Sequence, residues 1–198
     1  MKTAHKLAYL GESAIKWIAR IGISCPSCGC GRTTVVDRKF LVTQLRRCGG
    51  CNLTYRTPTG NAMRMERFYE LAYKEGFTTD LPSKSELARL LAEKFKGTEK
   101  DYSRYLEVLE AIGARRGERI FDFGCSWGYG SWQLGNAGFD VSSFEISSRR
   151  CRFAREQLKV DAHDNLDEIP AGFDIVFSAH VLEHVPKVGP TIKRLWDM

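Results

Sequence analysis

The C-terminal half of the chain alternates short apolar runs with segments of helical periodicity. Apolar runs at 120–123, 139–144, 160–163 and 173–178 predict four strands. Between them, the spacing of apolar residues predicts helices, the longest over 148–158 with Ser147 as its cap. Strands that alternate with helices are typical of βαβ units and a parallel sheet. The pattern therefore predicts an α/β fold for this part of the chain.

The N-terminal half is predicted to begin and end with helices. Residues 4–21 have apolar side chains at three- and four-residue spacing, which predicts one apolar helical face. We expect that face to pack on a neighbouring module or on a second copy, in preference to a membrane surface. Further helices are expected at 62–75, at 83–95 and at 101–112. The apolar face of the first helix consists of Leu7, Leu10, Ala14, Trp17, Ile18 and Ile21.

Two Cys-x-x-Cys pairs, separated by 19 residues, flank a predicted hairpin over 33–45. The spacing lies within the range of zinc sites, and four thiolates make a closed, structural, tetrahedral site. The pattern predicts a zinc ribbon over 23–58, which the metal should largely stabilise. Cys30 is an alternative second ligand of the first pair, although Cys28 mirrors the second pair better. The predicted ligands are Cys25, Cys28, Cys48 and Cys51.

Composition is that of a water-soluble globular chain of 198 residues, with 43% hydrophobic and 27% charged residues. Residues 1–60 carry ten Lys/Arg and two Asp/Glu, whereas residues 61–198 carry 20 and 22. The basic excess favours a polyanionic partner such as nucleic acid, and simple solubility is the alternative. No apolar run is long enough for a membrane span, and no signal peptide is recognisable. We therefore expect a cytoplasmic protein, whose seven cysteines bind metal or stay free.

The glycine-rich segment after the first strand carries the candidate chemistry. It reads Asp122-Phe-Gly124-Cys-Ser126-Trp-Gly128, and glycine lets the backbone approach a ligand closely. Glu145 follows Gly124 by 21 residues and ends the second strand, which suits an acid that binds ribose hydroxyls. The dinucleotide pattern G-x-G-x-x-G is not met in either frame. A different nucleoside-containing cofactor is therefore predicted.

The pattern D-x-G-x-S-x-G resembles motif I of class I S-adenosylmethionine (SAM) methyltransferases, which usually have glycine where Ser126 stands. The segment 179–186, A-H-V-L-E-H-V-P, resembles the block after strand four in many of these enzymes. With the cysteine pairs, residues 25–198 resemble bacterial class I methyltransferases that have an N-terminal zinc ribbon. The resemblance implies a Rossmann-like sheet of seven strands, of which only the first four, in the order 3-2-1-4, are recognisable. We therefore expect a C-terminally truncated, incomplete sheet whose fourth strand is an exposed edge open to self-association.

The resemblance also implies roles for single residues. Asp122 orders the motif, the loop admits the methionine part of SAM, and Glu145 accepts hydrogen bonds from the ribose. The acid that grips adenine is Asp164 or Asp161. His180 is the implied catalytic residue, because imidazole can accept a proton near neutral pH, and lining of the cofactor pocket is its alternative role. Contacts to SAM are also expected from Tyr69, Tyr73 and Thr78. The implied cofactor-binding residues are Asp122, Gly124, Ser126, Gly128, Glu145, Ile146, Asp164, Asn165 and Leu166.

The expected function is transfer of the SAM methyl group to a small-molecule or carbohydrate-type acceptor. One alternative is an RNA methyltransferase that docks through the basic ribbon, and another is a non-catalytic zinc-ribbon binding protein with a degenerate methyltransferase part. The expected organisation is a helix at 1–22, a zinc ribbon at 23–58, a helical cap at 59–114 and a SAM-binding domain at 115–198.

Overall fold

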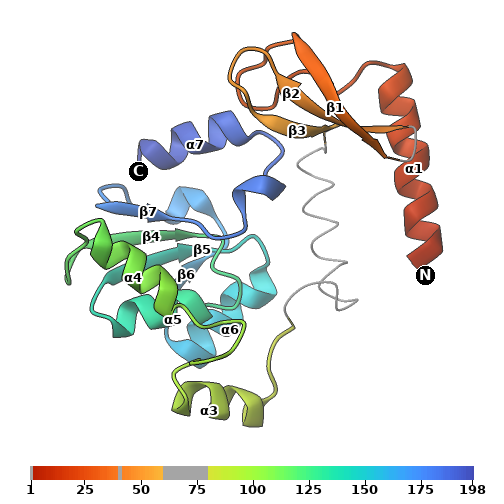
Figure 1. The fold of residues 1–198 in the computed structure, drawn as a ribbon. Coiled ribbons are helices and arrows are strands. Elements are labelled where there is room, and N and C mark those ends of the chain that lie inside the picture. Colours follow the sequence, from red (N-terminus) through yellow and green to blue (C-terminus); the bar gives the residue numbers. More distant parts are fainter. Residues whose placement is uncertain (1, 40–41, 60–79) are drawn as a thin grey trace. The chain divides into compact units, whose positions relative to one another are not determined.

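The computed structural model describes residues 2–39, 42–59 and 80–198, with side chains from residue 10 onward (Figure 1). The described residues form two compact units. One contains the N-terminal helix and the ribbon together with residues 183–194, and the other contains residues 80–182 and 195–198. The expected helix at 62–75 and the contacts expected from Tyr69, Tyr73 and Thr78 lie outside the described residues.

The ribbon is a three-stranded antiparallel sheet in the order β1-β2-β3. The first two strands form the predicted hairpin, which pairs Thr33 with Cys48 and has an irregularity between Val35 and Asp37. The third strand was not predicted, because four residues with Thr at both ends and Tyr and Arg between them give only a short apolar signal. The strands are β1 (Thr33–Lys39), β2 (Thr43–Cys48) and β3 (Thr54–Thr57).

The ribbon has a very small core, built around the two cysteine pairs. Cys25, Cys48 and Tyr55 are its buried residues, and the Tyr55 hydroxyl donates to the Ile23 carbonyl at 2.9 Å. A core of this size cannot offset the conformational entropy of the chain that surrounds it. The fold of the ribbon therefore depends on a further stabilising contact among the cysteines.

The N-terminal helix, α1 (Lys2–Ile18), leaves much of its predicted apolar face in solvent. Trp17, Ile18 and Ile21 are 45%, 77% and 56% exposed. On the polar side, Lys16 and Glu12 form an ion pair at 2.8 Å, one helical turn apart. The expected packing of this face on a neighbouring module is thus not seen for these three side chains.

The second unit is built on a parallel sheet of four strands in the order β6-β5-β4-β7. In sequence order this is third, second, first and fourth, which confirms the predicted order 3-2-1-4. Ile120 and Phe121 of the central β4 are fully buried, because both faces of a parallel sheet are covered. The strands are β4 (Arg119–Phe123), β5 (Asp140–Phe144), β6 (Asp161–His163) and β7 (Ile175–Phe177).

Helices follow the strands as the apolar periodicity predicts. Figure 1 shows α4, α5 and α6 gathered on one side of the strands. Two 3₁₀ turns, η1 (Leu166–Glu168) and η2 (Leu182–His184), complete the described elements. The α-helices are α3 (Lys84–Ala92), α4 (Ser103–Ala111), α5 (Tyr129–Asn136), α6 (Ser148–Leu158) and α7 (Val188–Trp196).

Helix α3 begins as predicted and ends earlier than predicted. Ser83 caps it by accepting from the Glu86 N–H at 3.2 Å. The expected continuation to Phe95 is wrong, because Lys94 and Phe95 have φ of +51° and +61° and leave the helix. This turn buries the Phe95 ring completely, against Trp127 at 5.9 Å. Tertiary packing thus overrides the helical periodicity of the last turn.

Because all four strands are parallel, their carboxyl ends meet at one edge of the sheet. This edge brings together the glycine-rich loop after β4, Glu145 after β5, Asp164 after β6 and the segment 178–181 after β7. No helix among the described residues is long and apolar enough to cross a membrane.

Candidate functional site

The glycine-rich loop makes a bend that is tied to the end of β5. The N–H groups of Gly124 and Cys125 both donate to the Phe144 carbonyl, at 2.8 and 2.9 Å, and the Gly128 N–H closes the bend onto the Cys125 carbonyl at 2.9 Å. Gly124, Ser126 and Gly128 have φ of +95°, +55° and +89°. Three left-handed residues in five explain why glycine dominates the segment.

Protein side chains come close to two of these glycines. A Cβ at Gly124 would overlap a methyl of Val181, and a Cβ at Gly128 would lie 2.8 Å from the Cβ of Ala154 in α6. The absence of side chains at these two glycines therefore lets α6 and the segment after β7 pack against the bend. The expectation that these positions admit the methionine part of SAM stays a prediction.

Asp122, the acid before the bend, is 1% exposed and joins three elements. Its carboxylate accepts from the Ser131 hydroxyl at 2.6 Å, and that hydroxyl accepts from the Ser143 hydroxyl at 2.9 Å. Burial raises the pKa of Asp122 to about 6, the Ser131 hydrogen bond opposes this rise, and the charge of Glu145 adds to it. This chain of contacts fixes β4, the first turn of α5 and β5, which is the geometry that an ordering role requires.

Glu145 lies at the bend, as the spacing predicts. It is 4% exposed, and its carboxylate accepts from the Ser147 N–H at 2.9 Å. Burial raises the pKa of Glu145, while the N–H groups of Ser147 and Ser126 and the charge of Arg150 lower it. The Ser126 N–H therefore links the carboxylate directly to the loop. Ile146, the next residue, is 42% exposed and offers an apolar side chain at the same edge.

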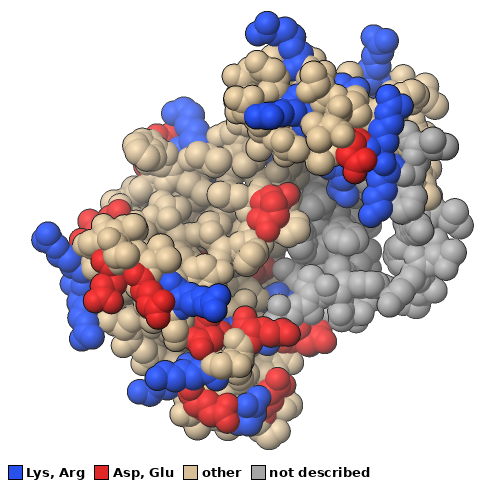
Figure 2. Space-filling view, in the orientation of Figure 1, with Lys and Arg blue, Asp and Glu red and all other residues tan. Residues whose placement is uncertain are grey.

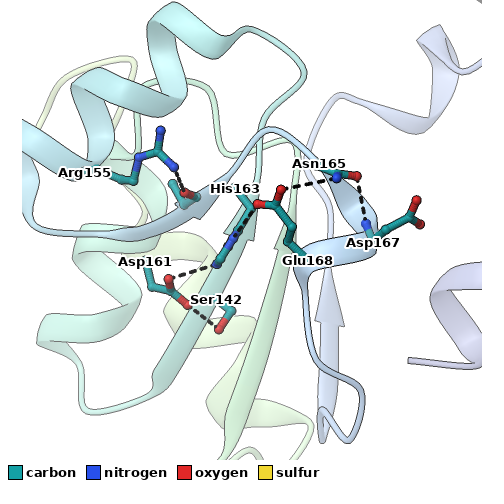
Figure 3. A network of polar contacts seen from close by, with 8 residues as sticks. Ser142, Arg155, Asp161, His163, Asn165, Asp167 and Glu168 are labelled. Carbon is teal, nitrogen blue, oxygen red and sulfur yellow. Dashed lines mark hydrogen bonds and ion pairs between the residues drawn. The ribbon is translucent and has the colours of Figure 1, made fainter.

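The third strand begins at one of the two acids between which the sequence did not decide and ends directly before the other. Asp161 stands at the amino end of β6, where its carboxylate accepts from Ser142 at 2.7 Å and contacts His163 at 3.0 Å (Figure 3). Asp164 follows the carboxyl end, and a hydrogen bond from the Ser148 hydroxyl lowers its pKa. Position and side-chain contacts therefore favour Asp164 over Asp161 as a residue of the loop edge.

The two residues after Asp164 begin the 3₁₀ turn η1. The Asn165 side chain accepts from the Asp167 N–H at 3.0 Å and donates to Glu168 at 3.3 Å (Figure 3). Asn165 thus caps η1, and Leu166 is its first residue.

His180 lies on the far side of β4 from Glu145, in the segment after β7. It is exposed and has φ of +58°, and its neighbour Val181 covers Gly124. The Ser178 hydroxyl anchors the segment by donating to the Phe123 carbonyl at 3.1 Å. The imidazole is therefore attached next to the bend, although its catalytic role stays a prediction.

Two buried side chains at the loop were not predicted. Arg150 of α6 is 5% exposed, and its Nη1 donates to the Ser126 hydroxyl at 2.8 Å. The signal that could have found it is its four-residue spacing from Ala154 and Leu158, which places it on the buried stripe of α6. Trp127 is fully buried, and its indole N–H has no acceptor within the part of the chain that the structure describes.

The four predicted metal ligands are brought together. Their sulfur atoms all lie within 4.8 Å of one another, with Cys25 to Cys51 at 3.6 Å and Cys28 to Cys48 at 3.5 Å. Tetrahedral zinc with bonds of about 2.3 Å places its sulfurs about 3.8 Å apart. The distances therefore fit a closed four-thiolate site.

Both cysteine pairs sit in the same kind of turn. In each turn the first Cys N–H donates to the carbonyl five residues on, and its carbonyl accepts from the N–H four residues on. The residues at the fourth step, Gly29 and Asn52, have φ of +72° and +61°. Cys30 supplies a carbonyl to the first turn, and its thiol lies 3.9 Å from the Arg32 carbonyl. This geometry favours Cys28 over Cys30 as the partner of Cys25.

Comparison with known proteins gives a family match over the sheet unit. Residues 121–198 match the family model described as "Methyltransferase domain". Among curated proteins, a ubiquinone biosynthesis O-methyltransferase from Aromatoleum aromaticum is 28% identical over 138 residues, which cover 65% of this chain and 53% of the relative. The same-named protein from Bordetella avium is 27% identical over 96 residues, which cover 43% and 40%. The chain thus spans about half or less of the length of these relatives.

Solved structures with a similar arrangement include magnesium protoporphyrin IX methyltransferase from Synechocystis PCC 6803 with bound SAM. It is 20% identical, with a TM-score of 0.48, over 69% of this chain and 73% of that one. A TehB-like SAM-dependent methyltransferase from Corynebacterium glutamicum is 21% identical, with a TM-score of 0.35, over 60% and 56%.

Proposed function

We propose that the chain, whose residues 121–198 match the family model described as "Methyltransferase domain", is a class I SAM-dependent methyltransferase that binds SAM at the bend 124–128 and transfers its methyl group to a small-molecule acceptor. The observation that carries the proposal is the position of Glu145, a buried acid at the end of β5 that the Ser126 N–H links to the glycine-rich bend. The relatives named O-methyltransferases support an acceptor of the small-molecule class.

Each of the residues at the loop edge contacts a different part of SAM. Glu145 accepts from the ribose hydroxyls, and the exposed side chain of Ile146 packs on the adenine ring. Asp164 accepts from the exocyclic amine, while the backbone at Asn165 and Leu166 meets the ring nitrogens. Bound SAM supplies an electrophilic methyl group, so the protein has chiefly to orient a nucleophile in line with it and to receive a proton.

His180 is the proposed residue for that last task. It follows β7 and precedes the side chain that packs on Gly124, so its position is set by the same bend that holds the cofactor. An exposed imidazole is accessible to an acceptor from solvent. Its replacement by glutamine should lower kcat without weakening SAM binding, whereas loss of both would indicate that it only lines the pocket.

The central test is calorimetric binding of SAM and of its demethylated product, S-adenosylhomocysteine (SAH). Glu145→Gln should weaken SAH binding roughly 10- to 100-fold, because a charged acceptor is lost from the ribose. Glu156→Gln, an exposed site on α6, is the matched control and should bind like the wild type. Equal affinities of the two variants would contradict the proposed site.

We further propose that Cys25, Cys28, Cys48 and Cys51 hold one structural zinc ion. The support is the 3.5 and 3.6 Å sulfur separations and the matched turns. A closed four-thiolate site has no open position for substrate, so the ion stabilises the ribbon and takes no part in the chemistry.

An RNA acceptor remains the second candidate, favoured by one observation. Arg32, Arg38, Arg47 and Arg56 of the ribbon are exposed, and most of the charged residues on the visible face of the ribbon in Figure 2 are basic. Counterion release makes such binding salt-dependent. Retention of RNA at low salt that is lost in an Arg38/Arg47 double Ala variant would support docking, and absence of retention would remove it.

Self-association is the last proposal. Among the described strands β7 lies at one edge of the sheet, and Val176 within it is 40% exposed. Gel filtration over a range of concentrations should show a size that grows with concentration, and a constant monomer would contradict this.

A further inference from the structure

Helix α6 places the buried side chain of Arg150, a cation, against the glycine-rich loop. Arg150 is 5% exposed, whereas its neighbours Arg149 and Arg152 are exposed. Its Nη1 lies 2.8 Å from the Ser126 hydroxyl oxygen, to which it donates. One turn further along α6, Ala154 packs against Gly128. The helix therefore contacts the bend at two points on one face, and the first of these contacts is charged.

Ser126 stands where methyltransferases of this class usually have glycine. Its φ of +55° lies in the left-handed region, where glycine is at ease and a Cβ is crowded. Relative to glycine, serine adds a Cβ and a hydroxyl, and that hydroxyl accepts from Arg150. The hydrogen bond between the two side chains thus accounts both for a serine with this unfavourable backbone conformation and for the buried guanidinium of Arg150.

The pair also stands within a group of buried acids. Asp122 on β4 and Glu145 after β5 are 1% and 4% exposed. Burial, with a further contribution from the charge of Glu145, raises the pKa of two buried thiols, Cys125 in the loop and Cys151 on α6. From β6, the His163 carbonyl accepts a hydrogen bond from the Glu145 N–H. Among these neighbours Arg150 is the one cation whose charge lowers the pKa of Glu145, against the rise that burial causes.

On the basis of the proposed function, we propose that Arg150 is a positioning residue of the cofactor site. It holds the bend through the Ser126 hydroxyl, and its positive charge stabilises the negative charge of the Glu145 carboxylate, the proposed acceptor of the ribose hydroxyls. Arg150 need not touch the cofactor for this role, since it acts through the two residues that the loop presents.

The first measurement does not depend on the cofactor. The side-chain carboxyl carbon of Glu145 is titrated by NMR in the full chain, in wild type, Arg150→Met, Arg150→Lys and the exposed control Arg149→Met. We expect the midpoint of Glu145 to move to higher pH by about 1 pH unit in R150M, to return most of the way in R150K, and to stay at the wild-type value in R149M. An unchanged midpoint in R150M would overturn the proposal, whatever the cofactor result.

The second measurement is SAH affinity between pH 5.5 and 8. R150M should bind roughly tenfold more weakly at pH 7, and its affinity should decline at a higher pH than that of wild type as the solution is acidified, because protonated Glu145 is a poorer acceptor. R150K should restore the pH profile more than the affinity. A loss of affinity in R150M with the wild-type pH profile would assign Arg150 a purely structural role and overturn the proposal.

Ser126→Gly keeps the inference testable should R150M fail to fold. Glycine suits the left-handed backbone, so thermal stability should be retained, while loss of the hydroxyl should weaken SAH binding roughly three- to tenfold. Wild-type affinity in S126G would overturn the role of the pair. Absence of SAH binding by the wild type would refute the proposed function and the positioning role with it, and the titration would still report whether Arg150 and Glu145 are coupled.

Discussion

Replacing Asp122 with asparagine should change how the stability of the sheet unit depends on pH. The carboxyl is 1% exposed, and burial raises its pKa from 3.8 to about 6. The folded chain therefore binds this proton more tightly than the unfolded chain does. The stability that results is fully present below pH 3.8 and is lost as the pH rises through about 6.

The size of the effect follows from the two pKa values. A change from 3.8 to about 6 corresponds to about 3 kcal/mol, at about 1.4 kcal/mol for each pH unit. About half of this falls between pH 5 and 7.5. Asparagine has no charge to desolvate and can still accept from Ser131, but its amide adds buried donors at a cost of about 1–3 kcal/mol. The D122N variant should thus be less stable than wild type at pH 5 and approach it at pH 7.5.

The assay is urea unfolding at several pH values with zinc held constant, followed by tryptophan fluorescence, for which Trp127 is a fully buried reporter. Asp140→Asn is the matched control, because the Asp140 side chain is 72% exposed on the neighbouring strand. The stability difference between wild type and D122N should shrink by about 1.4 kcal/mol from pH 5 to 7.5, and that between wild type and D140N should stay nearly constant. Parallel curves for wild type and D122N would refute the reasoning.

Three further outcomes are expected. Cys48→Ser should abolish stoichiometric zinc binding and unfold the ribbon by circular dichroism, while Cys30→Ser should keep one zinc per chain; zinc loss in both would contradict the four-ligand set. Gly130→Ala should destabilise the chain by about 1–2 kcal/mol in thermal unfolding, because a Cβ there would overlap the ring of Tyr102. Gly135→Ala in the same helix is the control: its Cβ would meet open space, so this variant should be neutral or stabilising. Trp127→Phe should lower the free energy of unfolding in urea by less than about 1.5 kcal/mol, because it also removes a buried N–H that has no acceptor among the described residues. A loss of about 3–5 kcal/mol, which is usual for a large core truncation, would show that this N–H is satisfied.

The sequence was sufficient where a local pattern decides the structure. Alternation of strands and helices predicted a parallel sheet, whose order 3-2-1-4 the resemblance implied, and the cysteine spacing predicted which four thiols meet. In both cases the residues that carry the signal are also those that make the contact. The bend was foreseen for the same reason, because left-handed backbone at Gly124 and Gly128 calls for glycine.

The sequence was insufficient where tertiary packing decides. Phe95 continues the periodicity of α3 but leaves the helix to reach the aromatic core. Ser147 was expected to cap α6 with its hydroxyl, and the structure shows it at the capping position with its backbone N–H donating to Glu145 instead. The burial of Arg150 depends on an acceptor 24 residues earlier in the chain. Only the fold brings such partners together.

The contact of Val181 with Gly124 connects the proposed cofactor loop with His180, the proposed proton acceptor. A ligand that approached Gly124 as closely as Val181 does would have to displace this valine, and Val181 is bonded directly to His180. In the proposed function, the loop that binds SAM and the proton acceptor His180 are thus joined through one peptide bond, and we expect binding at the loop to be accompanied by a displacement of the His180 imidazole.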